Sequence, residues 1–458
     1  MKALTIYHKL RPLFALLPLL LCGILLLPAR QIFAQTPITQ IENTAGDTVL
    51  VSFDDGGLLG LGVFGTGTNP VSGAGTRMMW YPAKAAFRAG RVYMNEWDNT
   101  NIGDYSAAFG SGVTASGDYS FATGFSDATA IGASALGNSK ATQRYASSFG
   151  TGKANGEYAT AFGFGSIASG DYSVAGGEVT EATARSATAF GLSTKALGYS
   201  SIAMGENAEA TYSRSAAIGW GTKASNSGAV AIGNGAIASG QDAIALGNQA
   251  WADGGESIAI GTLVKTEGIG GFAFGDRDFT ADTLRAGQFE FAVRASGGIN
   301  FYTSPDLSSG VTLGMGSGSW STLSDSTKKE HFRSIDGETV LTQIAQMPVP
   351  SWNYKTQPDS IRHMGPMAQD FYTAFGLGSS NKRISTVDID GVNMRAIQAL
   401  ETRTRMLQQK NEALETRVAK LEQQNQQTAS LPWSATVALL TLLIGGGIAL
   451  KNKPSSKG

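Results

Sequence analysis

The stretch 229-AVAIGNGAIASGQDAIALG-247 holds the pattern that decides the fold. Its two ends, 229-AVAIG-233 and 243-AIALG-247, share the order small residue, any residue, Ala, any residue, Gly, and they lie 14 residues apart. Between them, 236-AIASG-240 is a second segment in which residue types alternate. Two alternating segments with a turn between them predict two short strands in each unit.

The pattern recurs through residues 105–275, and its closing glycines keep a nearly constant spacing. Every interval from Gly163 onward is 14 residues, and three earlier intervals are 13. Fourteen residues are too few for a repeat that contains a helix, but they suit one turn of a parallel β-solenoid whose coils contact only their neighbours. The closing glycines are Gly110, Gly124, Gly137, Gly150, Gly163, Gly177, Gly191, Gly205, Gly219, Gly233, Gly247, Gly261 and Gly275.

Each repeat also predicts which side chains face inward. The Ala two residues before the Gly is expected to point into the solenoid, where only a small side chain fits, so the residue between them points outward. These outward residues form an exposed apolar stripe that monomers rarely tolerate, and self-association around a rotation axis is the simplest way to cover it. The stripe includes Phe190, Met204, Ile218, Ile232, Leu246 and Ile260.

The period and the small-x-Ala-x-Gly signature of residues 100–275 resemble the head repeats of YadA-type trimeric autotransporter adhesins. The resemblance implies a mainly β protein built on a left-handed parallel β-roll in which three chains pack side by side. It also implies binding of collagen or other host surfaces. The segment 227-SGAVAIGNGA-236 is near the adhesive motif of that family but does not reproduce it, so a host-surface protein or glycan ligand and a purely structural spacer both remain open.

The regions that flank the repeats are less regular. Residues 35–99 include apolar stretches such as 58-LLGLGVFG-65 and are expected to form an N-terminal β cap, because solenoids need covered ends. Residues 276–323 change to ordinary alternation, as in 288-QFEFAVRA-295, and predict a β connector.

The seam 318-GSWSTLSDSTKKEHF-332 separates this small-residue sequence from a helical, charged one. Four motifs follow in order: Ser-Asp-x-x-x-Lys, a strand with Trp and Tyr, a Gly-x-x-Ala-Gln-Asp helix start and a long helix. This order resembles the C-terminal intramolecular chaperone of phage tail spikes and endosialidases, peptidase family S74. The resemblance implies an α+β chaperone domain at residues 324–395 that assembles a homotrimer and cuts its own chain. The matching residues are Ser324, Asp325, Lys329, Trp352, Tyr354, Gly365, Ala368, Gln369 and Asp370.

By this resemblance Ser324 is the nucleophile and Lys329 is the base, and the cleavage site is the bond between Leu323 and Ser324. A serine hydroxyl needs a base to take its proton, and burial favours the neutral form of a lysine that serves as that base. A tight turn folds a spacing of five residues back on itself. Attack on the Leu323 carbonyl then forms an ester by an N-to-O shift, and water releases residues 1–323.

Neighbours of the pair leave its details open. Lys328 is either a rival base or a like charge that favours the neutral form of Lys329. His331 is a second rival base, and Asp325 is a candidate for orienting the turn. Thr327 stands where many members of the family have Arg or Asn.

Residues 396–427 carry a heptad repeat that predicts a coiled coil. Leucines occupy the d positions, and Asn411 and Asn425 at a positions would specify register at a cost in stability. The alternative is a single amphipathic helix on a globular core. The a and d positions are Ile397, Leu400, Thr404, Leu407, Asn411, Leu414, Val418, Leu421 and Asn425.

The two ends of the chain predict export and anchoring. Residues 1–34 combine basic residues, an apolar run and a cleavage position after Ala34, which is typical of a signal peptide, with an uncleaved membrane anchor as the alternative. Residues 433–450 predict a single transmembrane helix, and the alternative is a helical hairpin buried in an oligomer. Residues 451–458 contain three lysines and no acid, which is typical of a cytoplasmic tail.

Composition narrows the function classes. The net charge of −1 predicts no strong attraction to nucleic acid. The single cysteine, Cys22, lies in the predicted signal peptide, so no disulfide is expected in the mature chain, and no metal or cofactor is expected either. The sequence thus predicts an exported, surface-located trimeric fibre that frees itself by autocleavage. The alternatives are a permanently anchored adhesin without proteolysis and a tail-spike-like glycan-binding fibre.

Overall fold

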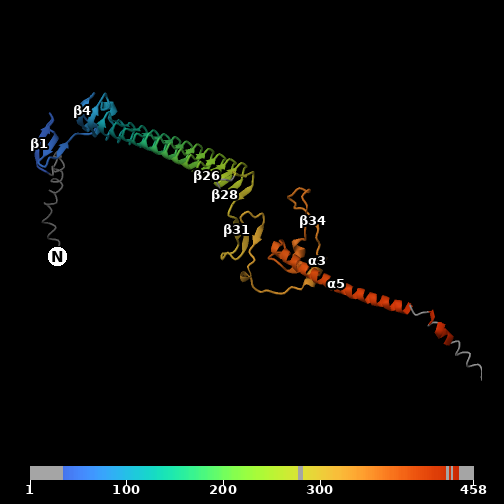
Figure 1. Cartoon of the computed structure of the whole chain (residues 1–458). Coiled ribbons are helices and arrows are strands. Elements are labelled where there is room, and N and C mark those ends of the chain that lie inside the picture. The colour runs from blue at the N-terminus through green and yellow to red at the C-terminus, as the bar shows by residue number, and fades with distance from the viewer. Residues whose placement is uncertain (1–34, 277–281, 430–432, 435–436, 443–458) are drawn as a thin grey trace, which may run out of the picture. The chain divides into compact units, whose positions relative to one another are not determined.

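The computed structural model describes residues 35–276, 282–429, 433–434 and 437–442. The predicted signal peptide of residues 1–34 lies outside this part of the chain. The chain divides into two compact units, Met1–Gly297 and Gly298–Gly458, which are described one after the other (Figure 1).

The first unit opens with two small antiparallel arrangements of strands. One is a three-stranded sheet, and the other is a hairpin whose second strand begins the parallel pairing of the solenoid. A short 3-10 helix, Pro82–Lys84, turns the chain within that hairpin. The strands are β1 (Pro37–Glu42), β2 (Thr48–Phe53), β3 (Leu58–Gly60), β4 (Gly75–Tyr81) and β5 (Ala86–Val92).

A parallel β-solenoid follows, with one longer and one shorter strand in each coil, as the repeat predicts. The longer strands are β6 (Ala107–Ser111), β8 (Phe121–Gly124), β10 (Ser134–Gly137), β12 (Ser147–Gly150), β14 (Thr160–Phe164), β16 (Val174–Glu178), β18 (Thr188–Leu192), β20 (Ile202–Glu206), β22 (Ala216–Trp220), β24 (Val230–Asn234) and β28 (Phe272–Gly275). The shorter strands are β7 (Thr114–Ala115), β9 (Asp127–Ala128), β11 (Lys140–Ala141), β13 (Lys153–Ala154), β15 (Ile167–Ala168), β17 (Glu181–Ala182), β19 (Lys195–Ala196), β21 (Glu209–Ala210), β23 (Lys223–Ala224) and β25 (Ile237–Ala238). In β26 (Ile244–Ala252) and β27 (Ile258–Thr266) the two strands of a coil merge.

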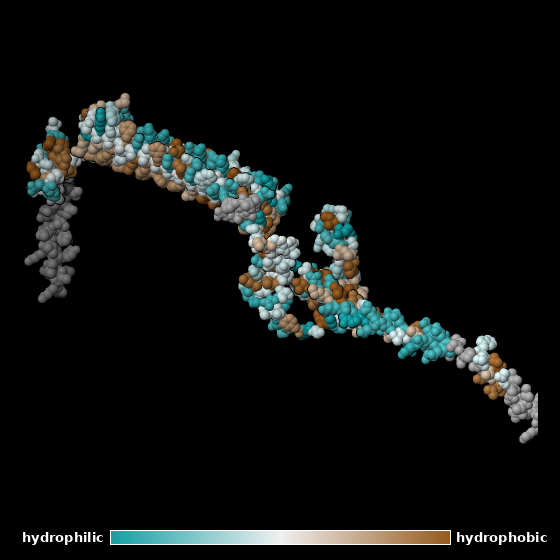
Figure 2. All heavy atoms as spheres, in the orientation of Figure 1, coloured by the Kyte–Doolittle hydropathy of each residue, from teal (hydrophilic) through white to brown (hydrophobic). Residues whose placement is uncertain are grey.

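The register confirms the predicted inward and outward positions. Ala203 pairs with Ala217 and Ala217 with Ala231, and these side chains are fully buried. The outward neighbours Met204 and Ile232 keep 39% and 38% of their surface exposed. An alanine column therefore fills the interior, and the apolar stripe lies on the outside, as Figure 2 also shows in the band of apolar residues along the solenoid.

The closing glycines are required by a close approach between coils. At Gly163 the backbone has φ +102°, and a Cβ atom would lie 2.1 Å from the carbonyl oxygen of Gly177. Any side chain at this position would therefore clash with backbone that has no freedom to move. The same contact recurs from coil to coil and explains why the spacing of these glycines is kept.

The 13-residue and 14-residue coils differ by one residue in the turn between their strands. After Gly191, three residues precede the second strand at Lys195, and the middle one, Ser193, has a left-handed φ of 54°. After Gly137 only two residues, both described, precede Lys140, and neither has a positive φ. The extra residue is thus a left-handed turn residue, and its absence leaves the strands in register.

A second left-handed position marks the opposite corner of each coil. In the first half of the solenoid this corner carries exposed tyrosines whose rings stack from coil to coil. Ring centroids are 5.0 Å apart for Tyr145 and Tyr158 and 5.1 Å apart for Tyr158 and Tyr172. These contacts offset part of the strain of a positive φ in a non-glycine residue.

The N-terminal end of the solenoid is closed by two large buried side chains. Arg88 occupies the inward column ahead of Ala108, where the other coils have small residues. Its guanidinium donates to the Ser106 carbonyl, the Ser106 hydroxyl and the Ala115 carbonyl at 2.9, 2.7 and 2.8 Å. Burial lowers the pKa of Arg88 to about 10, so the group stays charged at neutral pH. Trp97 is also fully buried, and its indole nitrogen donates to the Val113 carbonyl at 2.9 Å.

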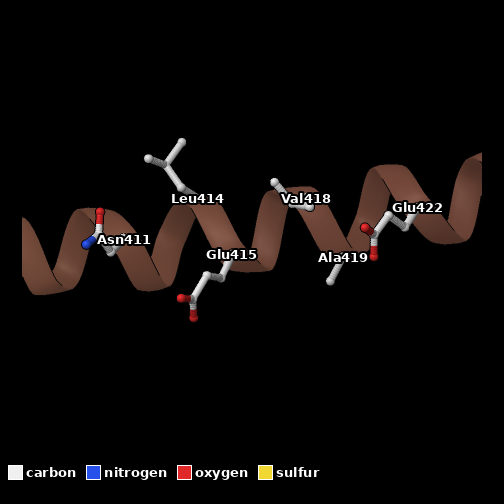
Figure 3. Close-up of a pocket in the computed structure, with 6 residues that line it drawn as sticks. All are labelled: Asn411, Leu414, Glu415, Val418, Ala419 and Glu422. Atoms are coloured by element: carbon white, nitrogen blue, oxygen red, sulfur yellow. The ribbon is translucent and has the colours of Figure 1, made fainter.

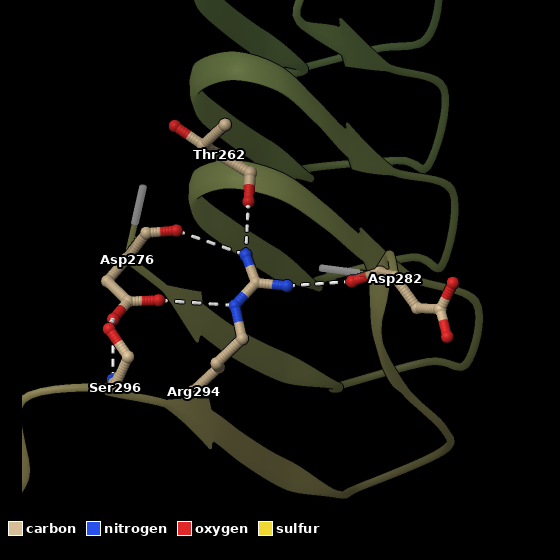
Figure 4. Close-up of polar contacts among 5 residues, drawn as sticks. All are labelled: Thr262, Asp276, Asp282, Arg294 and Ser296. Atoms are coloured by element: carbon tan, nitrogen blue, oxygen red, sulfur yellow. Dashed lines mark hydrogen bonds and ion pairs between the residues drawn. The ribbon is translucent and has the colours of Figure 1, made fainter. Parts of the chain in front are cut away.

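Parallel pairing continues past Gly275 into β29 (Leu284–Ala286) and β30 (Phe291–Arg294). Arg294 ties this last coil together (Figure 4): it donates to the Asp276 carboxylate at 3.2 Å and to the carbonyls of Thr262 and Asp282 at 2.8 and 2.7 Å. The hydroxyl and amide of Ser296, together with Arg294, hold the pKa of Asp276 below its usual range. The ion pair of Arg294 and Asp276, which also bonds neighbouring backbone and Ser296, therefore ends the solenoid.

The second unit combines a small antiparallel sheet with helices and a short hairpin. A buried cluster of Val340, Phe371, Val392 and Ala396 joins the three helices. The elements are β31 (Ile299–Tyr302), β32 (Gly310–Leu313), β33 (Trp320–Thr322), the 3-10 helix η3 (Ser326–Lys328), α3 (Gly337–Gln346), β34 (Ser351–Trp352), β35 (His363–Met364), α4 (Ala368–Phe375) and α5 (Thr386–Ala429).

Only the beginning of α5 packs against this core. Farther along, Leu407 and Leu414 are 53% and 49% exposed. Figure 3 shows Leu414 and Val418 projecting from one side of the helix and Glu415 from the other. The predicted heptad seam is thus present as an exposed apolar row in a single chain.

None of the helices in the described residues is both long and apolar enough to cross a membrane. The predicted span of residues 433–450 is described only at 433–434 and 437–442, and the predicted tail of residues 451–458 lies outside the described residues.

Candidate active site

The segment with the predicted nucleophile leaves the small sheet of the second unit directly. The amide of Leu323 donates to the carbonyl of Gly310 at 3.2 Å, which extends the pairing of β32 and β33 by one residue. Ser324 is the next residue. The predicted cleavage site therefore lies where regular backbone pairing ends and an exposed turn begins.

Local hydrogen bonds shape that turn. The Asp325 carboxylate accepts from the Thr327 amide at 2.8 Å, so Asp325 is the N-cap of η3. The carbonyls of Asp325 and Ser326 accept from the amides of Lys328 and Lys329 at 3.1 and 3.2 Å. Lys329 then returns to extended backbone, with φ −126° and ψ 152°.

This turn brings Ser324 and Lys329 together. The Lys329 Nζ atom donates to the Ser324 Oγ atom at 2.6 Å. The distance is within the reach that proton transfer requires. In its neutral form the same amine would accept the hydroxyl proton from Oγ.

The structure places the rival bases elsewhere. The positive charge of Lys328 lies near the Asp325 carboxylate and, after the hydrogen bonds from Thr327, helps to lower the pKa of that group. His331 lies 3.4 Å from a carboxylate oxygen of Glu330, and its side chain is 81% exposed. In this chain Lys329 is therefore the base candidate that contacts Ser324.

The electrostatic surroundings of the turn are those of open solvent. The amide and hydroxyl of Thr327, followed by Lys328, lower the pKa of Asp325, so its carboxylate is charged at neutral pH. Residues 321–336 are exposed throughout. The burial expected around Lys329 is thus missing, because no element among the described residues covers the turn.

Comparison with protein-family models agrees with both resemblances. The model described as YadA head domain repeat matches residues 102–126, 154–177, 182–211, 213–236 and 238–263. The model Peptidase_S74, described as chaperone of endosialidase, matches residues 324–376. The chain carries YadA head repeats and an S74 chaperone domain. No curated protein matches the chain.

The boundaries of these matches agree with the structure. The S74 domain begins at Ser324, the residue that Lys329 contacts. The head-repeat matches skip residues 127–153, which contain 13-residue coils. These coils nevertheless pair in register with their neighbours, so the solenoid continues through the unmatched stretch.

Downstream residues of the S74 domain form two further groups. The rings of Trp352, Tyr354 and His363 pack together, with centroids 4.8 Å apart for Trp352 and His363 and 5.0 Å for Trp352 and Tyr354. Ala368, Gln369 and Asp370 form the first turn of α4. Neither group has a hydrogen bond to Ser324 or Lys329 among the described contacts. In a single chain both groups therefore stabilise the fold of the domain and do not position the Ser324–Lys329 pair.

Two residues that no sequence pattern predicts hold the hairpin of the S74 domain. Gln357 lies with its Oε1 atom 2.9 Å from the Nε2 atom of His363, and Arg362 donates to the Ser351 carbonyl at 2.8 Å. Isolated polar residues in a loop give no periodic signal. Their partners become neighbours only when β34 and β35 pair.

Two acids of the solenoid bond to the backbone of its turns. Asp118 accepts from the Asp104 amide at 2.9 Å, and Asp171 accepts from the Glu157 amide at 3.0 Å. These carboxylates therefore bond backbone turns between neighbouring coils. Within the described part of the chain, no group of three His, Cys, Asp or Glu side chains is placed to hold a metal ion.

Proposed function

We propose that this chain is an exported, trimeric, adhesin-like surface fibre that its own S74 domain assembles and then releases by cutting between Leu323 and Ser324. The observation that carries the proposal is the 2.6 Å hydrogen bond between Lys329 Nζ and Ser324 Oγ at the first residue of the S74 domain. In this proposal the head repeats form the released fibre, and the domain that begins at Ser324 is the chaperone that assembles it.

The cleavage reaction needs no group beyond the chain and water. Neutral Lys329 takes the Oγ proton as Oγ bonds to the Leu323 carbonyl carbon. The bond from that carbon to the Ser324 nitrogen then breaks, and Lys329 returns the proton to this nitrogen. Water hydrolyses the ester, which leaves a carboxylate on Leu323 and restores the Ser324 hydroxyl at a new amino terminus.

Two exposed apolar surfaces support a homotrimer. On the solenoid, Ile202 and Met204 are 40% and 39% exposed in neighbouring outward columns. On α5, Leu407 and Leu414 leave the heptad row uncovered. Partner copies would cover both surfaces, with three left-handed rolls side by side and three helices in a coiled coil.

Assembly would also provide the burial of Lys329 that cleavage requires and that a single chain lacks. A lysine amine loses its proton more readily once it is removed from water. Residues 321–336 are exposed in one chain. We therefore infer that neighbouring chains cover the turn in the trimer, so that cutting follows assembly and the released fibre is kinetically trapped.

The proposed signal peptide of residues 1–34 would export the chain, and the proposed membrane span of residues 433–450 would hold it until it is cut. Cutting would then free the head repeats from the anchor. A host-surface protein or glycan as the ligand of the head is a separate proposal, which binding of the purified solenoid to extracellular-matrix and glycan arrays would test.

A denaturing gel of the full-length protein tests the cleavage. The wild type should separate into two pieces, with a new amino terminus at Ser324, and Ser324→Ala should stay whole. Ser326→Ala is the matched control, because Ser326 lies in the same turn and its carbonyl, not its hydroxyl, makes the turn hydrogen bond. Lys329→Ala should block cleavage and Lys328→Ala should permit it. An intact wild-type trimer would instead indicate an anchored adhesin without proteolysis.

A further inference from the structure

The turn that joins Ser324 to Lys329 is not covered by any element in the described part of the chain. Five residues of extended backbone would separate the Cα atoms of Ser324 and Lys329 by about 17 Å. In this turn the chain bends back, and the Lys329 Nζ and Ser324 Oγ atoms are 2.6 Å apart. Every residue from 321 to 336 is exposed, so little apolar packing supports this geometry. The pairing of Ser324 with Lys329 therefore depends on the hydrogen bonds within the turn itself.

One side chain makes the central bond of that set. The Asp325 carboxylate accepts from the Thr327 amide at 2.8 Å and begins η3. Because of this bond, the next two amides reach the carbonyls of Asp325 and Ser326. An N-cap acceptor of this kind satisfies an amide that the turn itself leaves without a partner.

We propose that Asp325 is a positioning residue for the cleavage proposed above, whose carboxylate caps the turn and so holds Lys329 Nζ against Ser324 Oγ. The role rests on that proposed function. It goes beyond it by assigning a task to a residue that touches neither reacting atom.

The direction of the carboxylate fits this task. A free carboxylate beside Lys329 would favour the ammonium form and oppose its action as a base. The Asp325 oxygen is instead engaged by the Thr327 amide, and the charged neighbour that acts on it is Lys328. The cap therefore shapes the turn without forming an ion pair with the base.

Two substitutions in the full-length chain separate the cap from the charge. Asparagine keeps a side-chain oxygen that accepts from the Thr327 amide, whereas alanine does not. Asp325→Ala should slow cleavage by between about twofold and thirtyfold, which corresponds to the usual cost of losing an N-cap. Asp325→Asn should restore the rate to near that of the wild type, and neither variant should move the pH at which the rate is half-maximal.

The readouts are the first-order rate of cleavage on a denaturing gel across pH, trimer formation by chemical crosslinking, and hydrogen exchange of the Thr327 amide in a Ser324→Ala background. Asp325→Ala should speed that exchange while Asp325→Asn preserves its protection. Equal rates in the wild type and Asp325→Ala would overturn the inference, as would an Asp325→Asn variant as slow as Asp325→Ala. A wild type that forms trimers without cutting contradicts the proposed function, and the positioning role with it.

Discussion

The solenoid and the S74 domain differ in how much of their structure one chain completes. In the solenoid each coil lies against the next, and a column of buried alanines such as Ala203, Ala217 and Ala231 fills the interior. The S74 domain has a small core around Phe371, and beyond it α5 extends with its apolar row exposed. The solenoid therefore builds its interior from its own neighbouring coils, whereas α5 of the second unit leaves an apolar row that the described chain does not cover.

The largest expected effect concerns the small core of the S74 domain. Phe371 is 2% exposed and packs with Val340, so Phe371→Ala should lower the free energy of unfolding of this domain by about 4 kcal/mol. Domain folding, trimer formation and cleavage should be lost together, as measured by thermal unfolding, crosslinking and a denaturing gel.

Tyr372→Ala is the matched control, because Tyr372 is the next residue on α4 and is 41% exposed. It should unfold within about 0.5 kcal/mol of the wild type. If Phe371→Ala assembled and cut normally, the core of α3, α4 and α5 would not be what organises the domain.

A smaller effect is expected from one closing glycine of the solenoid. A Cβ atom on Gly205 would lie 2.3 Å from the carbonyl oxygen of Gly219, at φ +116°. Gly205→Ala should therefore destabilise the solenoid by about 3 kcal/mol, measured by chemical denaturation. Gly221 also has a positive φ, of +61°, but a Cβ atom there would have nothing within 4 Å. Gly221→Ala should therefore lower the free energy of unfolding by only about 1 kcal/mol. Equal costs would mean that backbone strain alone, and not contact between coils, conserves the spacing.

The smallest effect is expected from shortening a coil. Deletion of Ser193 should convert a 14-residue coil into a 13-residue one, because it removes the left-handed residue and keeps the alternation of the strands. The loss of its backbone hydrogen bond to Glu178 and the relief of strain nearly cancel, so unfolding should change by about 1 kcal/mol or less.

Deletion of Ala189 is the contrasting change, since it turns an inward strand position outward and should prevent the coil from closing. A Ser193 deletion as damaging as the Ala189 deletion would show that coil length, and not the strand pattern, sets the register.

Sequence alone determined the features that repeat or that follow a fixed motif. The spacing of the closing glycines gave the parallel solenoid, and the alternation around each Ala gave its inward and outward faces. The place of Ser324 and Lys329 in an ordered set of motifs predicted that the two residues act as a pair. These features are readable because periodicity and short spacing are properties of the chain itself.

Only the tertiary structure decided the features that depend on side-chain reach. Arg88 fills the inward column by bonding carbonyls from a later coil, although its type predicts the surface. In the turn capped by Asp325, the Ser324 hydroxyl is hydrogen-bonded by the amine of Lys329 and not by that of the adjacent Lys328. The motif favours Lys329 over Lys328, but only the backbone turn shows which amine lies within hydrogen-bonding distance of the hydroxyl.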